Sequence, residues 1–248
     1  MDYWFSFAII LAAFTIFGIT GFGSAIIAVP WLVLIYPLEI VTPAVLILEF
    51  IASLLMNFHN KFLAEKKELI KIFPSTLFGM VFAVWILTIV SSAYLIVILG
   101  IFVLWNGFLV LVDAKNQLGK KVNKFWRNIF GFGAGVFATL FTTGGVFIAS
   151  YLVRKIDDPK ELRSTMALAI LLITSSVIAI MLISGIEIAP KAINLSISLV
   201  LPMLLGASLG FYIFKGMNAL LIRKFYGAIL MVSGMSLLTK QFIQLINL

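Results

Sequence analysis

The chain has 248 residues, of which 62% are hydrophobic and 11% charged, with a net charge of +8 and no cysteine. A soluble domain of this size cannot bury so much apolar surface, so the sequence predicts an all-α protein that crosses a membrane several times. Without cysteine and with a single histidine, we expect no metal and no cofactor. The basic residues lie in short loops between apolar runs, which argues against nucleic acid as a partner.

The first predicted element is an uncharged run of 34 residues, Tyr3–Tyr36, which is too long for one ordinary span and is interrupted by glycines. Its start lacks the basic cluster of a signal peptide, so we expect it to remain in the mature protein. Three ordinary spanning helices are predicted next, at Val41–Phe58, Ile72–Val90 and Ala93–Val112. Residues 114–128 are expected to form a basic cytoplasmic linker.

The second half begins with a similar glycine-rich segment, Ile129–Val153. Three further spanning helices are predicted at Ser164–Ser184, Ala192–Phe214 and Ala219–Thr239. Gly21–Leu32 aligns with Phe141–Leu152 at an offset of 120, and Pro74 and Pro202 form a second anchor in the same order. Residues 1–113 and 129–248 are therefore predicted to be two repeats, each a broken segment and three helices. Interrupted segments in matching halves indicate a transporter binding site.

The 18 basic residues test how the broken segments cross, because cytoplasmic loops carry an excess of Lys and Arg. If each of the two broken segments crossed the membrane once, as an ordinary span, the basic residues would divide 11 to 7 between the two sides. A hairpin at the second segment leaves 16 on one side and only Lys191 and Lys240 on the other. We therefore expect a hairpin in each half, inverted repeats, cytoplasmic basic loops and both termini on the non-cytoplasmic side of the cell membrane.

The predicted hairpin arms, such as Tyr3–Phe17 and Ser24–Tyr36, reach about 20 Å into a hydrocarbon core of about 30 Å. Their tips should meet near the midplane, where helix starts with free N–H groups favour an anion. Glycines would let the backbone approach the anion, and hydroxyls would cap the helices or donate to it. Tight helix crossing is the alternative role for the glycines. The candidate substrate-binding residues are Thr20, Gly21, Gly23, Ser24, Thr142, Thr143, Gly144 and Gly145.

The segment Gly21–Ala25 (Gly-Phe-Gly-Ser-Ala), followed by Val29–Leu32 (Val-Pro-Trp-Leu), resembles the repeat signature of the sulfite exporter TauE/SafE family, also called the toluene sulfonate uptake permease family. The resemblance covers the whole chain. It implies a secondary carrier in the plasma membrane for sulfur-containing oxyanions such as sulfite and organosulfonates. The chain departs from the family pattern where glycine is usual, at Ser24, Ala25, Phe141 and Thr143. These changes narrow the tips and add hydroxyls.

Glu49 is the one acidic residue well inside a predicted span, where a carboxylate is costly and usually functional. It either couples transport to protons or holds a hairpin tip through hydrogen bonds to amides and hydroxyls. Asn57 and His59 are candidates for a cytoplasmic vestibule, with an interfacial or dipole role as the alternative. Arg154 and Arg163 are assigned to topology, with attraction of anions toward the opening as the alternative.

These features favour an anion transporter that works by alternating access, with a small anion and the lipid bilayer as partners. The sequence leaves a homo-oligomer open. A passive anion channel is an alternative, since it could use the same helix dipoles. An enzyme acting on lipid is less favoured, because the chain has no His-Glu-x-x-His motif and no second intramembrane carboxylate near Glu49. We therefore expect no enzymatic activity.

Overall fold

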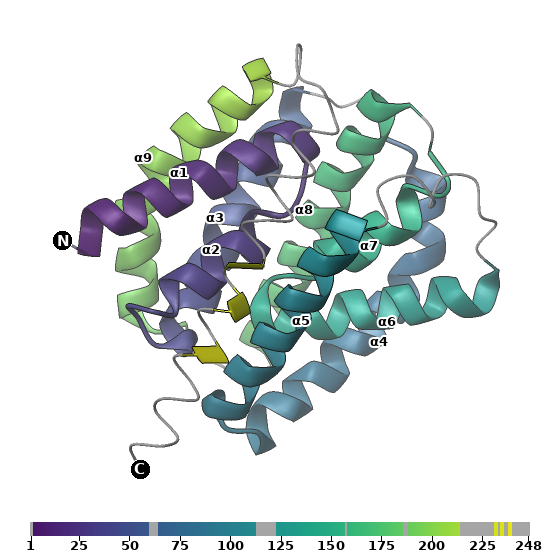
Figure 1. Cartoon of the computed structure of the whole chain (residues 1–248). Helices are drawn as coiled ribbons and strands as arrows, with labels where there is room; N and C mark the ends of the chain where they lie inside the picture. The colour runs from purple at the N-terminus through teal and green to yellow at the C-terminus, as the bar shows by residue number, and fades with distance from the viewer. Residues whose placement is uncertain are drawn as a thin grey trace.

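The computed structural model describes residues 2–59, 64–112, 123–156, 158–185 and 188–213, together with 231–232, 234–235 and 238–239. Over these residues the protein is helical and has no strand (Figure 1). Five of the described helices are long and apolar enough to cross a membrane. The prediction of an all-α chain with several membrane helices is therefore confirmed.

The helices of the first half are α1 (Asp2–Thr20), α2 (Ser24–Leu32), α3 (Leu38–His59), α4 (Lys66–Ile89) and α5 (Ser92–Val112). Those of the second half are α6 (Lys124–Phe141), α7 (Gly145–Leu152), α8 (Pro159–Ile183) and α9 (Pro190–Ile213). The last predicted helix, Ala219–Thr239, lies mostly outside the described residues. Its Gly234 is described, and it lies against the backbone of α5 at Gly100 and Leu104.

Several helices begin earlier than the apolar runs indicate, because polar caps extend them toward the membrane surface. The side chain of Asn123 accepts a hydrogen bond from the Trp126 amide, so α6 begins at Lys124 and not at residue 129. The end of the predicted linker 114–128 is consequently helical. Asp158 caps α8 in the same way, and Pro159 occupies its first turn, five residues before the predicted start.

Both broken segments are interrupted near the predicted positions, but their arms are unequal in length. The first arm, α1, has 19 residues and extends about 28 Å, so it is long enough to approach the far side of the hydrocarbon core. The first arm, predicted as Tyr3–Phe17, is therefore longer than expected, since its helix continues to Thr20. The second arms are shorter than expected, with 9 residues in α2 and 8 in α7.

The first arm of each half packs against a helix of the other half. Helix α1 packs along α9 of the second half, and α6 packs along α4 of the first half, as the paired helices on opposite sides of Figure 1 show. Glycines allow close backbone contact at both pairings: Gly210 lies against Thr15 and Gly18, and Gly135 lies against Thr76. Helices α3 and α8 contact each other between these pairs. The first helix of each half thus packs against the fourth described helix of the other: α1 against α9 and α6 against α4.

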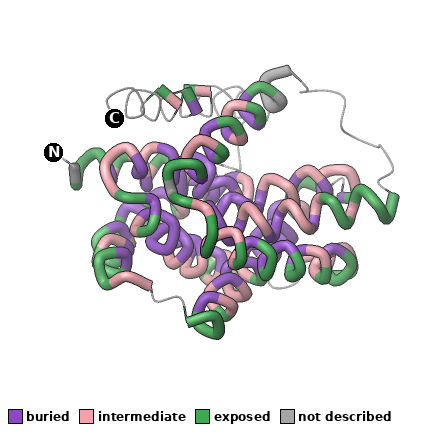
Figure 2. Tube along the Cα trace, turned by 90° about the horizontal axis from the view of Figure 1, so that it is seen from below, coloured by how far each residue is buried: buried purple, intermediate pink, exposed green. Residues whose placement is uncertain are grey.

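Large apolar side chains remain on the outside of the bundle. On α4 and α5 they include Phe78, Trp85, Tyr94 and Trp105, all of which are exposed. Figure 2 shows that buried positions gather inside the bundle and exposed ones on its outer faces. An apolar exterior of this kind suits lipid as the surrounding solvent, because lipid tails impose no cost on exposed hydrocarbon.

Candidate functional site

The first tip, residues 20–24, joins α1 to α2 through a turn that depends on glycine. Gly21 and Gly23 have φ angles of 82° and 89°, a conformation that residues with a Cβ rarely adopt. The hydroxyl of Thr20 bonds to the carbonyls of Ile16 and Phe22 at 2.8 and 2.7 Å. Thr20 therefore closes the turn locally, which is the capping role considered for its hydroxyl.

Glu49 of α3 reaches the start of α2. Its Oε1 atom accepts hydrogen bonds from the Ser24 hydroxyl and from the Ala25 amide, the latter at 3.1 Å. The side chain is only 2% exposed. These two donors, together with the positive end of the α2 dipole, offset part of the cost of burying a carboxyl group. Glu49 therefore makes the tip-holding contacts expected from the second of its two predicted roles.

The second tip, residues 141–145, is built differently. Thr142 ends α6 in the left-handed region with φ of 59°, and its hydroxyl donates to the Thr42 carbonyl of α3 at 3.2 Å. The neighbouring Thr143 hydroxyl is buried and has no hydrogen-bond partner among the described residues. The start of α7 carries no side-chain cap. At the first tip the Glu49 carboxyl accepts hydrogen bonds from the helix start. At the second tip no side chain caps the helix start, so its hydrogen-bond donors stay available.

Gly144 allows two helices to pack closely and does not line the cavity described below. A Cβ atom at this position would overlap the Ala134 carbonyl of α6, so the glycine allows α7 to fold back closely against α6. Gly21 is similarly pressed against the Arg163 carbonyl of α8. For these two residues the tight-crossing interpretation accounts for the glycine.

The two tips meet at a small cavity of about 10 Å³, close to the minimum that holds one water molecule. Segments that are about 120 positions apart in the sequence thus come together, as the alignment of the halves suggested. Five predicted site residues line it, whereas Thr20, Gly21, Ser24 and Gly144 do not. Its lining consists of Gly23, Ala25, Ile26, Glu49, Thr142, Thr143, Gly145, Val146 and Ile170.

Of the two predicted vestibule residues, Asn57 is not brought to this cavity. The Asn57 side chain donates to the Ser53 carbonyl of its own helix at 2.8 Å. His59 is the last residue of α3, and its side chain lies outside the described part of the chain. Asn57 lines neither the tip cavity nor the larger cavity described next.

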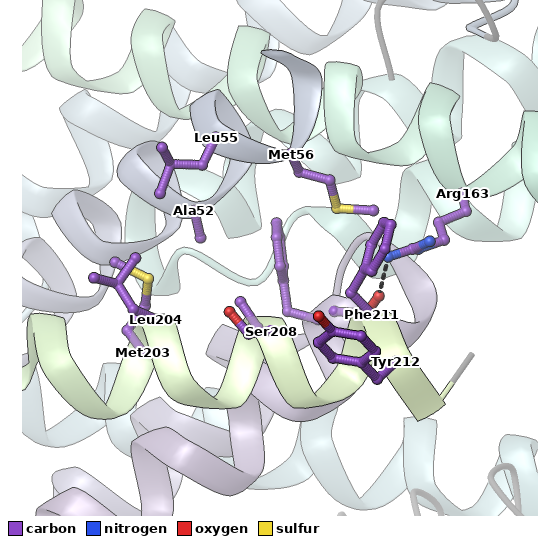
Figure 3. Close-up of a pocket in the computed structure, with 12 residues that line it drawn as sticks. Ala52, Leu55, Met56, Arg163, Met203, Leu204, Ser208, Phe211 and Tyr212 are labelled. Carbon is purple, nitrogen blue, oxygen red and sulfur yellow. Dashed lines mark hydrogen bonds between the residues drawn. The ribbon is translucent and has the colours of Figure 1, made fainter. Parts of the chain in front are cut away.

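A larger cavity of about 350 Å³ lies between α1, α3, α8 and α9 (Figure 3). Arg163 lines it and is only 7% exposed, although the sequence assigned this residue to a loop. Its guanidinium donates to the Gly18 carbonyl near the end of α1 and lies 5.0 Å from the centre of the Phe211 ring. The Asp158–Pro159 helix start was the signal that could have placed Arg163 inside α8.

Interrupted membrane helices that meet at a buried polar cavity are a design typical of membrane transporters. No group of three or more potential metal-ligating side chains occurs in the described portion of the chain. The sequence model of the sulfite exporter TauE/SafE family matches residues 6–237. The chain therefore belongs to this family, which is a family of membrane transporters and implies a sulfite or sulfonate exporter-type function. The comparisons find no significant match among curated proteins or solved structures.

Proposed function

We propose that the protein is a secondary transporter that moves a small sulfur-containing oxyanion, sulfite or an organosulfonate, across the plasma membrane. Family membership supports this class of cargo. The observation that carries the proposal is the cavity between the two tips, which joins Gly23 and Glu49 of one half to Thr143 and Gly145 of the other. A site made by both halves can open to either side when the halves move relative to each other, as alternating access requires.

The anion binds at the second tip. The start of α7 has no side-chain cap and the Thr143 hydroxyl is unpartnered in the described part, so both can donate to an oxyanion. At the first tip the Glu49 carboxyl already accepts the donors of Ser24 and Ala25. The cavity of about 10 Å³ is too small for an oxyanion, so the tips must separate before the cargo enters.

Glu49 couples the cargo to a proton. Of the residues that line the tip cavity, Glu49 alone has an ionisable side chain. A carboxylate about 5 Å from a bound anion would repel it by about 3 kcal/mol at an effective dielectric constant of about 20. A proton on Glu49 removes this repulsion, so each anion is carried with a proton.

The repeats are inverted, the basic loops face the cytoplasm and both termini face away from it. The reciprocal pairing of α1 with α9 and of α6 with α4 supports a two-fold relation between the halves. Because the chain has no cysteine, single cysteines at Gln117 and Pro159 can be labelled without background. An impermeant reagent should reach both from the cytoplasmic face. Labelling from opposite faces would reject the inverted arrangement.

Transport is tested with the full chain in liposomes. Sulfite uptake should saturate, show counterflow and respond to a pH gradient, whereas conductance at channel rates without counterflow would favour a passive channel. Gly145→Ala should weaken sulfite transport several-fold, because the added methyl group fills the tip cavity. The atoms nearest to this methyl group would be side-chain atoms of Ile170 and Phe22, which can shift. Gly133→Ala is the matched control, since the atoms nearest to its new methyl group belong to the Phe147 ring, which does not line the tip cavity.

A further inference from the structure

Two arginines meet at the end of the α6–α7 hairpin that lies away from the second tip. Helix α6 runs toward this tip from Lys124, and α7 runs away from it to Leu152. Arg127 in the first turn of α6 and Arg154 just after α7 therefore lie at the same end of the hairpin. Phe130, three residues after Arg127, joins them, because the Arg154 guanidinium carbon lies 5.3 Å from the centre of its ring.

Both arginines keep unused hydrogen-bond donors. Their Nε atoms are buried and have no hydrogen-bond partner among the described residues. Arg127 interacts electrostatically with the Tyr151 hydroxyl of α7, which itself donates to the Glu68 carboxylate of α4. That carboxylate already forms an ion pair with Lys71 at 2.6 Å. The negative charge on this side of the cluster is thus balanced by a lysine, whereas neither arginine forms an ion pair in the described part of the chain.

Exposed aromatic side chains stand beside these arginines. Phe125 and Trp126, in the first turn of α6, are 67% and 53% exposed. The Trp126 ring lies 6.4 Å from that of Phe130, centre to centre, so it belongs to the same cluster as Arg154. Tryptophan beside basic residues is typical of the headgroup level of a membrane, where an apolar ring and a polar N–H group are both accommodated. A ligand of this surface should therefore combine a negative charge with apolar chains.

We propose that Arg127 and Arg154 bind the phosphate of an anionic phospholipid, whose acyl chains lie along Phe125 and Trp126. Each guanidinium offers paired N–H donors that match two oxygens of a phosphate. Basic residues between membrane helices at the cytoplasmic side are typical sites for anionic lipid headgroups. A zwitterionic lipid carries no net charge and gains less from the two arginines. The site goes beyond the proposed function, because it needs neither the tip cavity nor transport.

The test uses the full chain in phosphatidylcholine vesicles in which dibrominated phosphatidylglycerol replaces part of the lipid. Bromine quenches tryptophan fluorescence on contact, and Trp126 is the reporter. Its quenching should saturate at a low fraction of the brominated phosphatidylglycerol, whereas dibrominated phosphatidylcholine should quench in proportion to its amount. Trp126→Phe should remove the saturating signal, and Trp85→Phe, which removes another exposed tryptophan, should keep it.

Arg127→Gln and Arg154→Gln should each weaken phosphatidylglycerol binding about tenfold, because each removes charge-assisted hydrogen bonds to the phosphate. Lys160→Gln is the charge-matched control, since this lysine at the start of α8 is exposed, and it should change binding less than about twofold. Arg127→Lys and Arg154→Lys keep the charge and keep the proposal testable if a glutamine variant fails to fold. Each should weaken binding about threefold, because an ammonium group lacks the planar fork.

Saturable quenching that the arginine variants weaken, and that inorganic phosphate leaves unchanged, is the expected result. Equal losses in the arginine and Lys160 variants, full affinity in both Arg→Lys variants, or quenching that rises without saturating would overturn the proposal. So would displacement of phosphatidylglycerol by inorganic phosphate, which would assign the two arginines to a soluble anion. Sulfite flux by the same preparations reports separately on the proposed function.

Discussion

The two tips differ in what stands opposite each helix start. At the first tip, Glu49 supplies a carboxyl group to Ser24 and Ala25, and at the second tip the cavity wall is the apolar Ile170. Both tips interrupt an apolar segment and begin a short helix, so their backbones offer similar chemistry. The side chain on the facing helix decides whether those donors are used internally or kept for a ligand.

The contrast extends to the way each tip is anchored. Gly21 of the first tip lies against the Arg163 carbonyl of α8, and Thr142 of the second tip donates to the Thr42 carbonyl of α3. Each tip therefore docks on the central helix of the other half. Related anchoring with unequal helix starts supports our proposal that the first tip is a structural joint and the second tip binds the cargo.

The largest effect is expected when the second tip is made like the first. Ile170→Glu would place a carboxylate against the start of α7, where it would compete with the cargo. Repulsion of about 3 kcal/mol at this range corresponds to a loss of about 100-fold in sulfite affinity. Binding to purified protein measures the loss. Ile170→Gln is the control, because it adds polarity without charge, and equal losses in both variants would refute the electrostatic explanation.

The converse change removes the carboxyl group that faces the first tip. Glu49→Gln keeps an oxygen that can accept from Ser24 or Ala25, so the fold should lose only about 1–3 kcal/mol of stability. Sulfite uptake should persist but should no longer respond to a pH gradient. Uptake by proteoliposomes, with and without the gradient, measures this coupling. A variant that still responds would leave Glu49 with a purely structural role.

The two hydroxyls next to the helix starts should behave in opposite ways. Thr143→Val removes a hydroxyl with no partner in the described part, so sulfite affinity should fall about tenfold with little change in stability. Ser24→Ala leaves the Glu49 carboxyl with one donor fewer, and it should cost about 1–3 kcal/mol of stability. Thermal unfolding and sulfite titration measure the two effects. Similar behaviour of both variants would contradict the division of roles between the tips.

The smallest effect is expected at Thr20, whose hydroxyl bonds to the backbone of Ile16 and Phe22 close by in the chain. Thr20→Val should cost about 0.5–1.5 kcal/mol of stability and leave sulfite affinity unchanged. Thermal unfolding and binding measurements check both parts. A clear loss of affinity would place Thr20 in contact with the cargo and restore the symmetrical site that the sequence predicted.

The breaks in both apolar segments were predictable because glycine and segment length are local signals. The two alternatives for Glu49 were also predictable, since a carboxyl group inside a span needs donors. The length of α1 was not, because Gly18 continues the helix where it packs against Ala207 and Gly210 of α9. The burial of Arg163 was missed for a similar reason: its partner, Gly18, lies 145 positions away.

Composition and spacing alone identified a helical membrane protein with two interrupted segments, because hydropathy and glycine act over a few turns of chain. Which glycines line a cavity and which relieve crowding depended on the packing of α6 against α7 and of tip against tip. The difference in hydrogen-bond partners between the two tips likewise depended on the tertiary structure. A helix start finds its hydrogen-bond partners on another helix, and those partners are known only when the chain has folded.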